Sequence, residues 1–72
     1  MSNTVHRLVT MANQISRAFA HRKHDEAVVE VAEHIKSFWE KRMLAQIYAH
    51  LDAGGEGLDP LARESLERLR KG

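Results

Sequence analysis

The sequence contains no cysteine, and this absence excludes two ways of stabilising a small protein. Without thiols the chain forms neither disulfides nor thiolate metal sites, which suits a reducing compartment. No apolar run approaches the roughly 20 residues of a membrane-spanning helix, and the N-terminus lacks the basic and apolar regions of a secretory signal. We therefore expect a soluble cytoplasmic protein.

The chain is also short, with 72 residues, and its formal net charge is +1. This length corresponds to a single helical domain, residues 1–72. A chain of this size buries only about 60% of the surface of its unfolded form, and its core contributes roughly 3–5 kcal/mol of net stability. With disulfides excluded, a partner or a second copy is the expected source of further stability.

Apolar residues recur at three- and four-residue steps, which is the period of an amphipathic helix. The first such segment, about residues 4–20, carries the stripe Val5, Leu8, Val9, Ala12, Ile15 and Phe19. The second is expected to begin with Asp25 as its N-cap. Its apolar arc consists of Ala27, Val28, Val31, Ala32, Ile35, Phe38 and Trp39.

The third segment, about residues 41–53, is followed by three glycines that can end a helix. Whether it continues the second helix stays open, although a shift in the phase of the apolar arc favours a kink or a break. The fourth segment begins with Asp59 as N-cap and Pro60 at the first helical position. No segment alternates as a strand does. The sequence predicts an all-α fold, a small bundle of three to four helices: a helical hairpin plus a third helix and a short C-terminal helix.

Phe38 and Trp39 are adjacent, yet both border the apolar arc of the second segment. Aromatic side chains at helical spacing usually pack inside, and we expect this of Phe38. Charged residues follow Trp39 directly, so we expect its outer edge to be accessible. Two interpretations of Trp39 with Arg42 stay open, a core position or an anchor for a partner, because Trp and Arg are enriched at interfaces.

The residues that usually carry chemistry form no recognisable site. The chain has five histidines, but the closest pair in sequence, His21 and His24, flanks Arg22 and Lys23, which repel a cation. There is no thiol nucleophile, and GGEG (54–57) lacks the Lys-Ser/Thr of a phosphate-binding loop. We therefore expect no catalytic residue, no cofactor-binding residue and no metal ligand.

Three stretches together resemble the delta subunit of the NAD-dependent formate dehydrogenases that contain molybdenum or tungsten: MANQI (11–15), EAVVEVAEHIKSFWEKRM (26–43) and AGGEGLDP (53–60). The resemblance covers about residues 5–62. It implies a small noncatalytic subunit, without a cofactor of its own, in a soluble complex. In this family the catalytic alpha subunit carries the molybdopterin metal centre and iron–sulfur clusters. The delta subunit supports assembly or stability of the complex, including maturation of its metal cofactor.

The positions that match the family motifs are expected to form the surface for the alpha subunit: Met11, Asn13, Gln14, His34, Phe38, Trp39, Arg42 and Met43. The family stretch reads Phe-Trp-Asp-Pro-Arg-Met followed by a base. Glu40, Lys41 and Leu44 replace the Asp, the Pro and that base here. Without the proline the helix start is less strongly enforced, so helices two and three could merge.

Two other functions are compatible with the residues. One is a small helical nucleic-acid-binding or regulatory protein that uses the HRKH turn (21–24), although the near-neutral charge and the acids downstream count against it. The other is a self-associating helical protein of unrelated role. An isolated delta subunit can also form a homodimer that covers its apolar surface, so dimerisation alone does not separate these functions.

Overall fold

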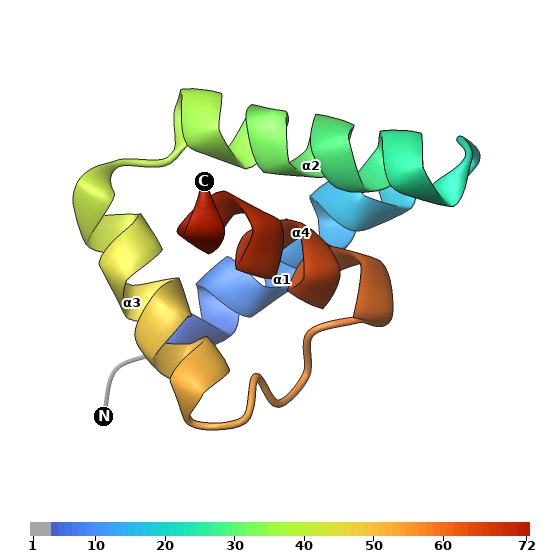
Figure 1. The fold of residues 1–72 in the computed structure, drawn as a ribbon. Coiled ribbons are helices and arrows are strands. Elements are labelled where there is room, and N and C mark those ends of the chain that lie inside the picture. The colour runs from blue at the N-terminus through green and yellow to red at the C-terminus, as the bar shows by residue number, and fades with distance from the viewer. Residues whose placement is uncertain (1–3) are drawn as a thin grey trace.

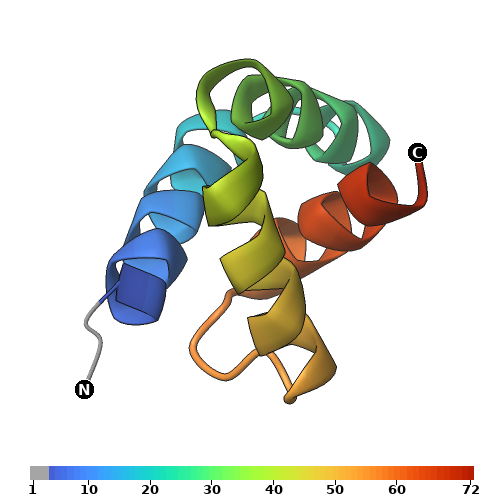
Figure 2. The same ribbon diagram turned by 90° about the vertical axis from the view of Figure 1, so that its left-hand side faces the viewer.

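The computed structural model describes residues 4–72, and within this range the chain forms four helices and no strand. Helix α1 spans Thr4–Phe19, α2 His24–Phe38, α3 Lys41–Asp52 and α4 Pro60–Lys71 (Figure 1). The first two helices form a hairpin, α3 leads away from the end of α2, and α4 returns to pack against α2 (Figures 1 and 2). The predicted all-α bundle, with its hairpin, third helix and short C-terminal helix, is confirmed.

The apolar stripes of the helices meet in one core. Every helix contributes to it, and so does the loop before α4, so the core forms only when all four helices are assembled. Its buried members are Leu8, Val9, Ala12, Val31, Ile35, Trp39, Ile47, Leu51, Leu58, Ala62 and Leu66.

The backbone between α2 and α3 shows that these two helices do not merge. Trp39 has φ −96° and ψ 136°, and Glu40 has φ −77° and ψ 161°, so both residues are extended. The helical hydrogen bonds start again with the Leu44 N–H, which donates to the Glu40 carbonyl oxygen at 3.0 Å. The break that the phase shift favoured is therefore present, although Lys41 and not a proline opens α3.

Of the two predicted N-caps, one is confirmed and one is wrong. The Asp59 side chain accepts a hydrogen bond at 2.7 Å from the backbone N–H three residues on, and Pro60 is the first residue of α4. In contrast, Asp25 does not cap α2. The helix begins one residue earlier, at His24, and Lys23 stands at the N-cap without a side-chain hydrogen bond. Asp25 instead lies in the first turn, where a negative charge still favours the helix terminus.

The glycine-rich loop ends α3 as predicted. Three glycines have positive φ values: 119° at Gly54, 65° at Gly55 and 90° at Gly57. Residues with a side chain rarely adopt this backbone conformation. The Gly55 N–H donates to the His50 carbonyl oxygen at 2.8 Å and closes the helix end. From α4, Arg63 donates to the carbonyl oxygens of Gly54 at 2.9 Å and Gly55 at 3.2 Å. The loop is therefore attached to both helices that it joins.

Arg70 connects the end of α4 to α3. Its guanidinium donates to the carboxylates of Asp52 at 2.6 Å and Glu67 at 2.8 Å, and these hydrogen bonds raise the pKa of Arg70. The same guanidinium lies 6.0 Å from the ring centroid of Tyr48. Burial raises the pKa of Tyr48 above its ordinary value of 10.0, and the charge of Arg70 offsets part of that rise. Arg70 is therefore charged and Tyr48 neutral at ordinary pH.

Candidate functional site

Phe38 and Trp39 have exposures opposite to those expected, and both expectations are wrong. Phe38, expected in the core, is 71% exposed, whereas Trp39, whose edge was expected to be accessible, is 6% exposed. Phe38 is the last residue of α2 and lies at the edge of its apolar arc, so its ring remains in solvent. Trp39 leaves the helix with extended backbone, and this turn directs the indole into the core. The structure thus agrees with the core interpretation of Trp39.

Three rings from α1 and α2 lie next to one another, with His34 between Phe19 and Phe38. The ring centroid of His34 lies 4.7 Å from that of Phe38 and 6.2 Å from that of Phe19, at interplanar angles of 37° and 60°. Phe19 and His34 are half-buried, so Phe38 is the ring that projects furthest into solvent. We call Phe19, His34 and Phe38 the Phe38 patch.

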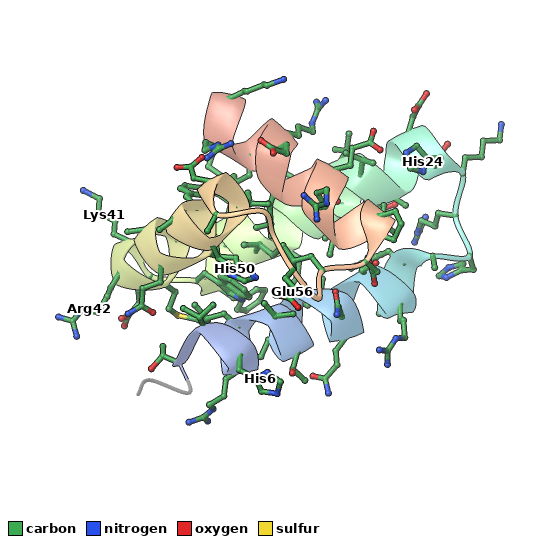
Figure 3. The ribbon with its side chains drawn as sticks, turned by 90° about the horizontal axis from the view of Figure 1, so that it is seen from below. His6, His24, Lys41, Arg42, His50 and Glu56 are labelled. Carbon is green, nitrogen blue, oxygen red and sulfur yellow. The ribbon has the colours of Figure 1, made fainter. Side chains whose placement is uncertain are left out.

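The remaining expected interface residues divide between the surface and the interior. Met11 on α1 is 37% exposed, and Gln14 and Arg42 are also exposed. Figure 3 shows Arg42 directed away from the N-terminal end of α3. Met43 is half-buried and packs against the core. Of the expected interface residues outside the Phe38 patch, Met11, Gln14 and Arg42 are therefore the ones with exposed side chains.

Asn13 has an intramolecular role that the sequence analysis did not assign to it. Its Nδ2 donates to the Gly57 carbonyl oxygen at 2.9 Å, and its Oδ1 accepts the N–H of Asp59 at 2.9 Å. The Ser16 hydroxyl donates to Asp59 Oδ1 at 2.9 Å, the same oxygen that caps α4. We call Asn13, Ser16 and Asp59 the loop latch, because these side chains fix the α3–α4 loop against α1.

Asn13→Asp is expected to lower the free energy of unfolding by about 1–2 kcal/mol, because a carboxylate cannot donate to Gly57 and lies close to the Asp59 carboxylate. The two side chains have nearly the same shape, so packing is conserved. Urea unfolding followed by circular dichroism measures the effect. Gln14→Glu makes the same chemical change on the exposed neighbour, and a shift within about 0.5 kcal/mol is expected there. Equal losses in both variants would contradict the latch.

The sequence analysis does not place Ser16 in the loop latch or Phe19 in the Phe38 patch. For each residue, the sequence contains only a weak indication of its role. Ser16 is a polar residue within the apolar stripe of α1, and it is 2% exposed. A buried hydroxyl requires a hydrogen-bond partner, but the sequence does not say which one. Phe19 closes the same stripe in the last turn of α1, where few further residues of its own helix can cover it.

A groove of about 750 Å³ lies between α2 and α4. Val28, Ala32 and Leu69 supply its apolar part, and acids and bases alternate around them. Within residues 4–72, no three side chains of the histidine and carboxylate types lie close enough to hold a metal ion.

In the part of the chain that the structure describes, no helix combines the length and apolar character that crossing a membrane requires.

The basic turn HRKH (21–24) between α1 and α2 forms ion pairs with carboxylates of the same chain. Arg22 Nε lies 3.0 Å from a Glu30 carboxylate oxygen, and His24 Nε2 lies 2.7 Å from Glu64 Oε1. A nucleic-acid phosphate would have to compete with these carboxylates for the same donors. This arrangement adds no support to the nucleic-acid-binding alternative.

A family model described as NADH-dependent formate dehydrogenase delta subunit FdsD matches residues 7–66. The matched range includes every residue of the Phe38 patch and of the loop latch. No curated protein and no solved structure is significantly similar to the chain.

Proposed function

Since this chain belongs to the family of NADH-dependent formate dehydrogenase delta subunits, we propose that it is a noncatalytic subunit that binds the catalytic subunit of such a complex. The Phe38 patch is the centre of the contact surface. Met11, Gln14 and Arg42 extend this surface on α1 and α3. The chain supplies no reacting group and acts by binding.

The other three expected interface residues act from inside the chain in this proposal. Trp39 and Met43 pack against the core at the junction of α2 and α3, and so they hold Phe38 and Arg42 in position. Asn13 acts through the loop latch, which fixes α4 against α1. Substituting any of these three would therefore change binding through the fold and not through a lost contact.

The observation that carries the proposal is the exposure of Phe38. Among residues 4–72 the exposed large apolar side chains are Met11, Val29 and Phe38, and Phe38 at 71% is by far the most exposed. Full burial of such a side chain contributes about 1.5–3 kcal/mol. Binding energy at protein interfaces concentrates in a few side chains of this kind. The contact with His34 limits the freedom of the ring, so less conformational entropy is lost on binding.

Binding would stabilise both partners by mass action, because a partner that binds only the folded state shifts the equilibrium towards it. A chain with a core this small gains much from such a contact. We propose that the bound subunit supports assembly or stability of the complex, including maturation of the metal cofactor in the catalytic subunit.

Deletion of this chain from the cell tests the function. We expect formate oxidation by the remaining subunits to fall, and a tagged copy of the chain to restore it and to co-purify with the catalytic subunit. Metal content per catalytic subunit separates the possible roles. A parallel loss of metal and activity indicates cofactor maturation, whereas full metal content in dissociated subunits indicates assembly or stability.

An intact and fully active complex in the absence of this chain would overturn the proposal. A homodimer of the isolated chain would not, because the isolated chain leaves the Phe38 patch in water and association covers it.

A further inference from the structure

Two basic residues follow the Phe38 patch directly in the sequence. Lys41 and Arg42 begin α3, just after the two-residue connection from Phe38, and both are exposed. Figure 3 shows both side chains pointing into solvent at the N-terminal end of α3. At most four residues separate either base from Phe38, so all three side chains can contact the same partner surface.

These bases differ from several others in the described residues, because no carboxylate forms an ion pair with them. Arg22 pairs with Glu30 at 3.0 Å, and Arg70 pairs with two carboxylates. Over residues 4–72, neither Lys41 nor Arg42 takes part in an ion pair, and the first turn of α3 contains no acid.

The charges near the Phe38 patch differ between the helices. Helix α1, which supplies Phe19, contains Arg7 and Arg17 and no acid. Helix α2 carries several acids, of which Glu30 is paired with Arg22 and Glu33 lines the groove towards α4. The charged residues within four positions after Phe38 are Glu40, Lys41 and Arg42, so positive charge is in excess there.

We propose that the partner surface that receives Phe38 is an apolar socket bordered by carboxylates, which pair with Lys41 and Arg42. This inference rests on the proposed function and specifies the chemistry of the contact. Complementary charges at the rim of an interface accelerate association and suppress wrong partners. Arg42 can bind a carboxylate through two parallel hydrogen bonds, which also fixes the orientation of the small subunit.

A single-stranded nucleic acid can also bind such a surface, because its phosphates attract Lys and Arg and its bases stack on exposed rings. The basic turn between α1 and α2 is already paired with carboxylates of the same chain, and the matching family model describes a subunit of an enzyme complex. These two observations favour an acidic protein surface over a nucleic acid.

The test reverses the charge of this chain at two pairs of positions and measures its association with the catalytic subunit. The double variant Lys41→Glu with Arg42→Glu is compared with Lys23→Glu with Lys71→Glu. Both control residues are exposed, Lys23 directly before the first residue of α2 and Lys71 at the end of α4. The net charge changes equally in both variants. Acids in the first turn of a helix favour its terminus, so the variant of α3 is not expected to unfold. Each tagged chain is expressed in cells that lack the native copy, and its association rate with the purified catalytic subunit is measured at several salt concentrations.

We expect reversal at Lys41 and Arg42 to slow association at least about tenfold at low salt and to remove most of its salt dependence. Reversal at Lys23 and Lys71 should leave the rate within about twofold, because charges far from a contact are screened by salt. An unchanged rate for the first variant, or equal slowing in both, would overturn the acidic socket while leaving the proposed function intact.

Two other outcomes are also decisive. Co-purification of the wild-type chain that disappears after nuclease treatment would show that a nucleic acid, and not a carboxylate surface, meets the two bases. A wild-type chain that does not bind the catalytic subunit at all would overturn the proposed function itself.

Discussion

Trp39→Ala is expected to leave the isolated chain largely unfolded at room temperature. The indole is 6% exposed and belongs to the core cluster to which all four helices contribute. Truncating a buried Trp to Ala costs about 3–5 kcal/mol. The whole core of a chain this size contributes only about 3–5 kcal/mol of net stability, so a single substitution removes most of it.

Circular dichroism during urea titration measures this effect. The variant should show little helical signal without urea and no cooperative transition, whereas the wild-type chain should unfold in one transition. Phe38→Ala is the matched control one residue away. Its side chain is 71% exposed, so we expect a change within about 0.5 kcal/mol.

Trp39→Phe provides a second comparison, because it retains an aromatic side chain and should lose less stability than Trp39→Ala. If Trp39→Ala unfolded at the same urea concentration as the wild-type chain, the indole could not be part of the core.

The contrast between these neighbours marks the limit of what helical periodicity predicts. The arc of α2 includes Phe38 and Trp39 equally, because the period does not say at which residue the chain leaves the helix. The structure places that point at Trp39, where ψ changes to 136°. One residue more of helix would have left the indole at a different angle to the core. Burial of the two aromatics was therefore decided by the residue at which α2 ends, which the phase shift between the apolar arcs does not fix.

Local signals predicted other features well. Asp59 and Pro60 define the start of α4 through their own backbone and side-chain chemistry, and the structure confirms both. The apolar stripe of α1 is also confirmed, since Leu8, Val9 and Ala12 are buried. The local residues predict the start of α3 less directly than they predict the start of α4. The helix break is present with Glu40 at the N-cap and Lys41 as the first residue of α3, without a proline to enforce it.

The loop latch shows which part of the candidate site could not be predicted. Asn13 bonds to residues 44 and 46 positions further along the chain. Nothing in MANQI specifies that partner, so the sequence alone suggests a contact surface for another protein. A polar residue within a family motif serves the fold here, although Gln14 beside it is exposed. Only the assembled fold shows that Asn13 bonds within the chain whereas Gln14 faces solvent.

Phe38→Ala is expected to weaken binding of the folded chain to the catalytic subunit by about 30-fold or more. Loss of an aromatic anchor at the centre of an interface costs about 2 kcal/mol or more, and each 1.4 kcal/mol corresponds to about a factor of ten in affinity. The isolated chain should keep its stability, so the loss reports the contact and not the fold. Titration of the purified catalytic subunit with wild-type and variant chains gives the two dissociation constants.

Val29→Ala is the matched control for this measurement. Val29 is an exposed apolar residue of the same helix, at 37% exposure, and lies beside Glu26 and Glu30 on another side of α2. If any exposed apolar side chain on α2 were enough to bind the partner, Phe38→Ala and Val29→Ala would both weaken binding. We expect only Phe38→Ala to do so. His34 holds the Phe38 ring in place, whereas no aromatic ring flanks Val29 among the described residues. Unchanged affinity for Phe38→Ala would remove this patch from the contact surface and direct the search to the groove between α2 and α4.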